Sequence, residues 1–260
     1  MDLLSQVAHR AYPPPRRPWI MRQRWHDLLF AHWPVDAETL RAALPAPLRP
    51  HLDLYDGRAW LGVVPFWMSG VRFRWMPAIP GLSTFPELNV RTYVRVGDIA
   101  GVYFFSLDAA CLPAVWGARS TYHLPYQYAE MSVVRSFGVI GDVPPMTVPL
   151  ESGEVGYFSN RLDAPPAEFR ARYRGWKDSA PARPGSLEHF LVERYCLYSV
   201  KPDGTVLRAH IHHRPWSLQA GQAEIATNTM VAPLGVSLER KPVLHYAAEI
   251  DVLVWWPERV

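Results

Sequence analysis

The segment from Glu87 to Val94 constrains the fold of this chain more than any other, because polar and apolar side chains alternate along it. Successive side chains of a β-strand point to opposite faces, so its polar members share one face: Glu87, Asn89, Arg91 and Tyr93. Such a row fits either a solvated face or the wall of a polar cavity. The next segment, Val102 to Leu107, is almost wholly apolar and predicts a strand covered on both faces, which favours the cavity. Asp108 follows it directly as a carboxylate at a strand end.

Short strands, hairpin turns and two or three short helices predict an α+β domain centred on a β-barrel. Asp56-Gly57 and Pro202-Asp203-Gly204 are turn signals between apolar runs. Asp36 is expected to cap a helix that ends at Pro45, and Ser186 to cap a second one. The polar, proline-rich residues 163–185 are expected to form a surface excursion. We predict one domain over residues 20–260, preceded by a flexible arm over residues 1–19.

Composition narrows the class of protein. The 260 residues are 49% hydrophobic, enough for a substantial core, and carry a net charge of only +3. No basic block indicates nucleic acid binding, and no apolar run is long enough to cross a membrane. The N-terminus lacks the apolar segment of a signal peptide, so we expect a cytoplasmic protein. The sequence predicts a small-molecule ligand and leaves the formation of homo-oligomers open.

Several segments together resemble the YqjF-like family of bacterial proteins: FPELNVRTYV, GVYFFSLDA, LPYQYAEM, SLEHFLVERYCLY and HIHHRPW. The resemblance covers roughly residues 20–256. That family is in turn similar to the acetoacetate decarboxylase-like fold, a cone-shaped antiparallel β-barrel with a few short helices and an internal pocket. The more distant similarity is carried by HWPVDAETLRAALPAPL and WGARSTYHLPYQ. This resemblance implies the same barrel and a pocket inside it.

The sequence departs from the decarboxylases where they carry two lysines after a proline. If Pro125 stands for that proline, Tyr126 and Gln127 occupy the lysine positions. Imine chemistry needs an amine there, and the chain's three lysines, Lys177, Lys201 and Lys241, are distant in sequence. Arg119 stands where the family has an acid, with Glu87 and Asp108 as candidate substitutes. The resemblance therefore implies that the barrel is kept while the Schiff base is lost.

Two groups of side chains are candidates for chemistry. The row of Glu87, Asn89 and Arg91 could bind a ligand carboxylate or polarise a carbonyl, or it could be an ion pair that stabilises the interior. A second group lies within a short span and could form an anion clamp with a general acid or base, or a packed aromatic corner: Arg119, Tyr122, His123 and Tyr126.

The HIHH stretch is a third candidate. His210 and His212 would share a strand face and could chelate a metal with a third ligand such as His123 or Glu87. Ordinary partly buried histidines fit the same pattern, and the sequence predicts neither a bound metal nor a cofactor.

These observations predict an enclosed, aromatic-lined polar pocket that binds a small organic acid or carbonyl compound. Glu87, His123 and Tyr126 are the predicted proton-transfer residues. The predicted ligand contacts are Asn89, Arg91, Tyr93, Asp108, Arg119, Tyr122, Gln127, His210 and His212. Three hypotheses follow: a lyase or isomerase without a Schiff base, a non-catalytic binding or sensing protein, and a metal-dependent enzyme using HIHH. Whether the protein is an enzyme is left open.

Overall fold

A computed structural model describes residues 3–135, 138–141, 150–163 and 165–260. Within these residues the chain is mostly β-structure with three α-helices: α1 Ala37–Ala43, α2 Leu112–Tyr122 and α3 Leu187–Val192. The strands are β1 Met21–Val35, β2 Ala59–Phe73, β3 Phe85–Val96, β4 Ile99–Ala109, β5 Tyr126–Arg135, β6 Gly138–Gly141, β7 Val155–Arg161, β8 Glu168–Pro181, β9 Cys196–Val200, β10 Val206–His212, β11 Ser217–Asn228, β12 Val243–Val254 and β13 Glu258–Arg259. Short 3₁₀ turns lie at Leu3–Ser5, Ala46–His51 and Ala232–Leu234.

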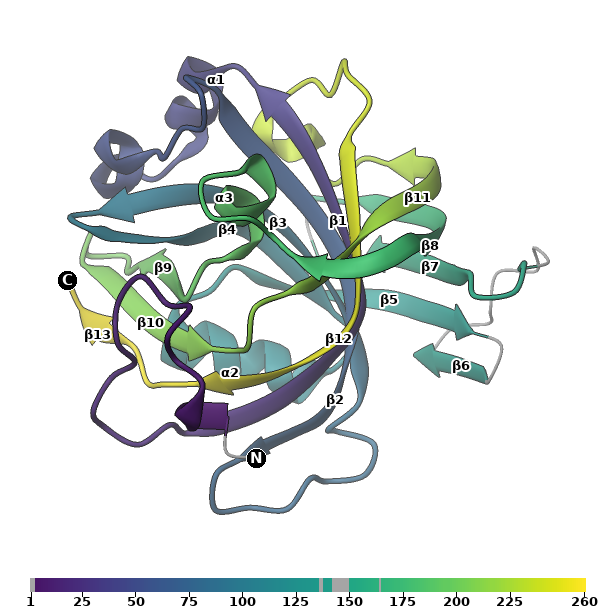
Figure 1. Cartoon of the computed structure of the whole chain (residues 1–260), viewed down its shortest axis with the longest axis horizontal. Coiled ribbons are helices and arrows are strands. Elements are labelled where there is room, and N and C mark those ends of the chain that lie inside the picture. Colours follow the sequence, from purple (N-terminus) through teal and green to yellow (C-terminus); the bar gives the residue numbers. More distant parts are fainter. Residues whose placement is uncertain (1–2, 136–137, 142–149, 164) are drawn as a thin grey trace.

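The strands form one sheet whose pairings return on themselves (Figure 1). One ring follows the order β4, β3, β2, β1, β12, β11, β8, β7 and β5, and the pairing of β5 with β4 closes it. A second closure runs from β4 through β9 and β10 to β12. The predicted strands over Glu87–Val94 and Val102–Leu107 are confirmed as the central parts of β3 and β4.

Not all of the pairings are antiparallel, which corrects part of the expectation. β4 pairs in parallel with both β5 and β9. Parallel neighbours need a crossover connection, and α2 supplies it between β4 and β5. The sequence reading did not identify this helix. Pro113 lies in the first turn of this helix, where Pro is tolerated because its missing N–H is not needed.

Most of the described part of the polar region 163–185 is a strand, which is a second correction. Residues Glu168–Pro181 form the long strand β8, paired with β7 on one side and β11 on the other. Phe169, Ala171 and Tyr173 are buried while the arginines between them are not. The strand is therefore amphipathic, with its polar face made by arginines rather than by turn residues.

Both faces of the central strands are buried, and they pack into two separate hydrophobic clusters. In β1, Leu29 and Ala31 belong to one cluster, whereas Leu28 and Phe30 belong to the other. The second cluster also contains Phe66 and Trp216, and it surrounds the cavity described below. This alternation explains why Leu28 to Ala31 of β1 form a continuous apolar run rather than an alternating pattern.

The expected helix caps are present. The Asp36 carboxylate accepts a hydrogen bond from the backbone N–H of Thr39 at the start of α1, over 2.8 Å. The Ser186 hydroxyl accepts one from the backbone N–H of His189 at the start of α3. Both helices therefore begin where side-chain oxygens satisfy free backbone donors, as the sequence predicted.

The N-terminal residues that the structure describes lie against β10. The Arg10 guanidinium is buried and donates to the carbonyl of Ile211 over 2.8 Å. The flexibility of residues 1–19 stays a prediction.

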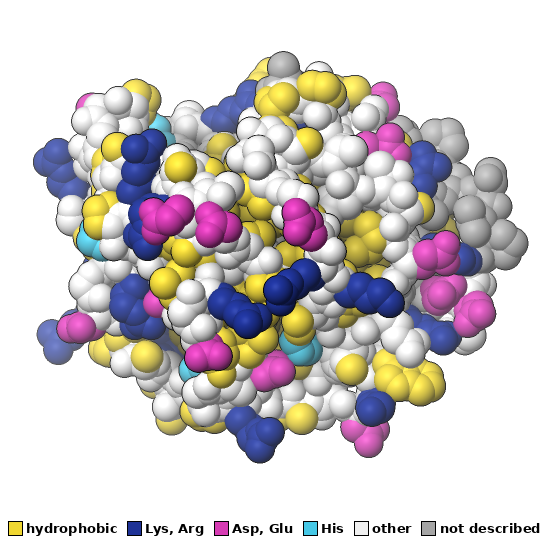
Figure 2. All heavy atoms as spheres, turned by 90° about the horizontal axis from the view of Figure 1, so that it is seen from above, with side chains coloured by type: hydrophobic (Ala, Val, Ile, Leu, Met, Phe, Trp, Pro, Cys, Tyr) yellow, Lys and Arg dark blue, Asp and Glu magenta, His cyan; other side chains and the backbone are white. Residues whose placement is uncertain are grey.

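On the face shown in Figure 2, basic and acidic side chains are interspersed rather than gathered by sign. None of the helices in the described part of the chain is long and apolar enough to cross a membrane. The cytoplasmic location and the absence of nucleic acid and membrane partners stay expectations from the sequence.

Candidate functional site

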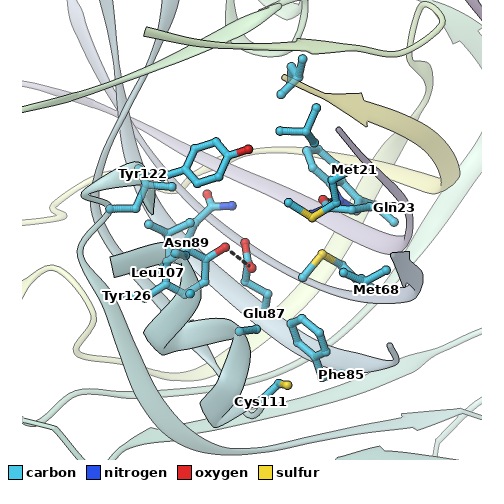
Figure 3. Close-up of a pocket in the computed structure, with 18 of the residues that line it drawn as sticks. Met21, Gln23, Met68, Phe85, Glu87, Asn89, Leu107, Cys111, Tyr122 and Tyr126 are labelled. Carbon is cyan, nitrogen blue, oxygen red and sulfur yellow. Dashed lines mark hydrogen bonds between the residues drawn. The ribbon is translucent and has the colours of Figure 1, made fainter. Parts of the chain in front are cut away.

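A cavity of about 400 Å³ lies between β2, β3, β4 and α2. Its wall is mostly apolar and includes Met68, Phe85 and Leu107 (Figure 3). A few polar side chains converge on it, and Glu87, Asn89, Tyr122 and Tyr126 lie close together in the close-up view. Apolar cavities with a few convergent polar groups are the usual form of small-molecule sites.

Strand β3 supplies the polar row. Glu87, Asn89 and Arg91 line the cavity and are 4%, 5% and 9% exposed, so the predicted row is buried rather than solvated. Hydrogen-bonded neighbours on both sides hold β3 in register: Asn89, for example, lies opposite Val64 of β2 and Leu107 of β4. Period-two alternation in a strand covered on both faces therefore directs these three side chains inward.

Glu87 is a buried carboxyl group with a raised pKa. Its Oε2 accepts a hydrogen bond from the Tyr126 hydroxyl over 2.7 Å. Loss of hydration on burial raises the pKa of Glu87 to about 7; the Tyr126 hydrogen bond acts against this shift, and the nearby Asp108 charge adds to it. Glu87 can therefore exchange a proton near neutral pH.

Arg91 is a buried cation without an acidic partner. Among the described residues, no carboxylate lies within 4.0 Å of its guanidinium, so the ion pair considered for this row is not formed. Its Nε has no hydrogen-bond partner in the described structure, and Nη2 reaches only the carbonyl of Leu191 at 3.4 Å. The Oδ1 atom of Asn89 is likewise buried without a partner. Unsatisfied buried polar atoms call for an explanation, and a bound ligand is one.

The second predicted group, formed by Arg119, Tyr122, His123 and Tyr126, does not come together at the cavity. Two of its members line the cavity wall and two lie outside it, so the four-residue clamp is not formed. Tyr122 and Tyr126 line the cavity, and the Tyr122 hydroxyl donates to the carbonyl of Trp255. Arg119 is exposed on the outer side of the helix, where it pairs with Asp163. His123 ends the helix with a left-handed backbone (φ 51°) and does not line the cavity. The cavity side of α2 carries Ala114, Ala118 and Tyr122 at i, i+4 spacing, and Arg119 is turned by about 100° from Ala118 around the helix axis, off that side.

Three other predicted ligand contacts also lie outside the cavity wall. Gln127 accepts a hydrogen bond from Arg119 near the surface. Asp108 is fully buried in an ion pair with Arg161, 2.8 Å away. The Tyr93 hydroxyl is hydrogen bonded to Nε2 of His32 over 2.6 Å. The pairing of β3 with β4 contains a β-bulge between Val90 and Arg91, shortly before Tyr93 in the strand.

The HIHH stretch does not form a metal centre in the described part of the chain. No group of three His, Cys, Asp or Glu side chains there is arranged to hold a metal ion. His210 pairs with Glu258, and Nε2 of His212 is hydrogen bonded to the carbonyl of Leu3. Both imidazoles are thus used in holding the C-terminal and N-terminal segments against β10.

Several polar residues of the cavity wall were not predicted from the sequence, among them Arg194 and His213. Arg194 follows α3 and pairs with Asp53, 2.7 Å away. Burial lowers the pKa of His213 to about 3, so its ring is neutral at pH 7. Arg194 lies between α3 and β9 and His213 directly after β10, so neither belongs to the polar row of β3.

All three lysines of the chain lie in described segments, and none of them lines the cavity. Lys177 and Lys241 are exposed. The expectation that the chain lacks a Schiff-base lysine at this site therefore agrees with the geometry.

The fold is that of the acetoacetate decarboxylase-like proteins. An acetoacetate decarboxylase-like enzyme from Sphingomonas wittichii RW1 superposes with a TM-score of 0.60, covering 97% of each chain at 15% identity. The enduracididine biosynthesis enzyme MppR complexed with pyruvate superposes with a TM-score of 0.61, covering 98% of this chain and 97% of that one at 11% identity. At such low identities the likeness establishes the fold alone.

Within that fold the chain belongs to the DUF2071 family, described as an uncharacterized conserved protein (COG2071), which it matches over residues 22–251. It is 44% identical to the uncharacterized protein YqjF of Bacillus subtilis (strain 168) over 238 residues, 91% of either chain. The resemblance drawn from the sequence motifs is confirmed.

Proposed function

We propose that the cavity binds an organic acid or carbonyl compound, that Arg91 holds its negative charge, and that Glu87 transfers a proton to or from it. The observation that carries the proposal is the Arg91 guanidinium, buried in the cavity wall with no carboxylate of the described chain beside it. An unpaired charge in an apolar environment is costly. A ligand carboxylate would relieve that cost, and the planar guanidinium suits it geometrically.

The proposed chemistry is proton abstraction next to a carbonyl group. Ionised Glu87 takes a proton from the carbon beside the carbonyl; the electron pair of the broken C–H bond forms a C=C bond to the carbonyl carbon, and the π pair of the C=O bond moves onto oxygen to give an enolate. In a substrate with a β,γ C=C bond, protonated Glu87 returns the proton to the γ-carbon, which shifts the double bond into conjugation and completes an isomerisation. A pKa near 7 suits a general base at neutral pH. Tyr126, hydrogen bonded to the same carboxyl group, would orient it.

The solved neighbours give limited support for the ligand class. MppR has been seen complexed with pyruvate, a small oxoacid, and other neighbours are acetoacetate decarboxylase-like enzymes. We also propose that the closed strand pairings form the cone-shaped barrel of that fold. Because none of the three lysines lines the cavity, we propose a reaction that forms no imine intermediate.

Ligand binding is the first test. Pyruvate, acetoacetate and larger monocarboxylates are titrated while the fluorescence of the cavity tryptophans Trp25 and Trp216 is followed. We expect Arg91→Met, which keeps most of the side-chain volume, to weaken binding of every acid at least tenfold. Arg174→Met removes a charge from the surface, far from the cavity lining, and should change nothing. Equal binding by Arg91→Met and the unaltered protein would overturn the proposal.

Proton exchange separates an enzyme from a binding protein. An enzyme of the proposed kind should catalyse exchange of the hydrogens beside the carbonyl of a bound oxoacid with D₂O, detected by proton NMR. Because the base must be ionised, the rate should rise with pH with a midpoint of about 7. Glu87→Gln should abolish exchange while retaining binding. Binding without any exchange would instead favour the alternative of a non-catalytic sensing protein, which the Arg91 observation fits equally well.

A further inference from the structure

We infer that the ligand is a carboxylic acid with an extended apolar portion, bound with its carboxylate at Arg91 and its apolar end directed toward the loop between β2 and β3. This inference rests on the proposed function and narrows its substrate class.

The order of side chains along β3 gives the cavity a direction. The inward-facing residues run from Arg91 through Asn89 and Glu87 to Phe85, so three polar side chains are followed by an apolar one. Phe85 pairs with Met68 of β2, another apolar lining residue. At about 3.3 Å per residue, the Cα positions of Arg91 and Phe85 are roughly 20 Å apart. A three- or four-carbon acid at Arg91 would leave the Phe85 end of the cavity unfilled.

The volume leads to the same conclusion. A cavity of about 400 Å³ holds roughly a dozen water-sized groups, since each water occupies about 30 Å³ of the liquid. A three- or four-carbon oxoacid fills roughly half of this space by the same measure. The rest of the wall is mostly apolar, with Gln23, Arg72 and Ser83 among the exceptions. Filling the remaining space with hydrocarbon is therefore more favourable than filling it with water.

Exposed apolar residues continue the cavity wall to the surface. Five of the lining residues form the rim of the cavity, and each is between 39% and 45% exposed. They come from the end of β2, the loop before β3 and the segment after β12: Phe73, Met76, Ile79, Leu82 and Trp256. The cavity is therefore open at this end rather than fully enclosed as expected. Isolated exposed apolar residues are ordinary, whereas a group of them around a cavity mouth is typical of a binding site.

The test compares two acids that differ only in chain length. Butanoate and octanoate, the latter kept below its micellar concentration, are titrated into the full-length protein by calorimetry, with octan-1-ol as the uncharged analogue. Each buried methylene is worth up to roughly a fourfold gain in affinity. We expect octanoate to bind at least tenfold more tightly than butanoate and than octan-1-ol. We expect Arg91→Met to remove the preference for octanoate over octan-1-ol.

A rim variant locates the apolar end. Met76→Ser with Ile79→Ser changes two side chains that are already exposed, so folding should be preserved. This double variant should weaken octanoate several-fold and leave butanoate unchanged. Leu162→Ser removes an equally exposed apolar side chain outside the cavity and should affect neither acid.

The outcomes separate a failure of the extended ligand from a failure of the proposed function. If butanoate, pyruvate and octanoate bind equally and all depend on Arg91, or if only the short acids bind, the proposed function stands and the extended ligand is refuted. If octan-1-ol binds as tightly as octanoate and Arg91→Met has no effect, the cavity does not select acids and both are refuted. If none of the acids binds, both the proposed function and the extended ligand are refuted.

Discussion

The Tyr126 hydroxyl donates a hydrogen bond to Oε2 of Glu87, and this 2.7 Å contact joins the first residue of β5 to the inner face of β3. The two residues are 39 positions apart in the chain. Their contact depends on α2, which carries the chain from the end of β4 back to the start of β5. Because the hydrogen bond favours the ionised carboxylate, it partly offsets the effect of burial on the pKa of Glu87.

Removing this hydrogen bond should raise the pKa of Glu87 further. In Tyr126→Phe the carboxylate loses its donor while remaining buried, so we expect its titration midpoint to move above about 7. The carboxyl stretching band in infrared difference spectra across pH measures the midpoint, and Glu87→Gln assigns the band. Tyr122→Phe is the matched control, since that hydroxyl donates to Trp255 instead. A midpoint that stays in place or falls would show that the hydrogen bond does not tune Glu87.

Replacing Glu87 by Gln should stabilise the fold at high pH. The folded protein holds the Glu87 proton up to about pH 7, whereas the unfolded chain releases it near pH 4.5. Between these values the folded state binds more protons, so this group makes the unaltered protein less stable as pH rises. At pH 8 the variant should gain up to about 3 kcal/mol, with almost no gain at pH 4. Urea unfolding at the two pH values measures this difference, and a pH-independent effect would contradict the assigned pKa.

The buried ion pair of Asp108 and Arg161 should be essential for stability. Their side chains are 0% and 3% exposed, and Arg161 also donates to the Ser106 hydroxyl. Asp108→Asn leaves a buried guanidinium uncompensated, which should cost about 3–5 kcal/mol in unfolding free energy. The double variant Asp108→Leu, Arg161→Met should recover part of that loss. Arg174→Met breaks a surface pair and should cost less than about 1 kcal/mol. Equal losses in the buried and surface variants would refute this assignment.

Two glycine substitutions should have opposite effects on the free energy of unfolding. A Cβ atom at Gly101 of β4 would lie 2.6 Å from Sγ and 2.8 Å from the carbonyl oxygen of Cys196 in β9. Gly101→Ala should therefore destabilise the protein by about 1–3 kcal/mol through overpacking. At Gly117 in α2 a Cβ atom meets nothing within 4 Å, so Gly117→Ala should add about 0.5–1 kcal/mol through helix propensity. Thermal unfolding without ligand compares them, and a stable Gly101→Ala would mean that β4 and β9 can separate.

Local patterns predicted the elements that depend on neighbouring residues. The alternation in β3, the Asp36 and Ser186 caps and the turn at Asp203-Gly204 are all present. Each rests on side-chain direction or on a hydrogen bond within a few residues. Burial of the polar row was also anticipated, because the apolar β4 segment beside it required cover on both faces.

The elements that were missed depend on distant partners. β8 is a strand because β7 and β11 pair with it on both sides, and those pairings outweigh the low strand propensity of its charged residues. In the same way, α2 is identifiable as a crossover only once β4 and β5 are known to be parallel neighbours. Arg119 and His123 lie outside the cavity lining, because the side of α2 that faces the cavity is set by the packing of the helix against β4 and β5.

Backbone periodicity and residue identity were enough to predict which side chains of β3 share a face, where α1 and α3 begin, and that no lysine stands at the decarboxylase positions. Three features came from the folded chain alone: the shared face borders a cavity, Arg91 has no acidic partner among the described residues, and Tyr126 reaches Glu87. Burial and pairing depend on which strands distant in sequence pack against one another, and local periodicity carries no information about that choice.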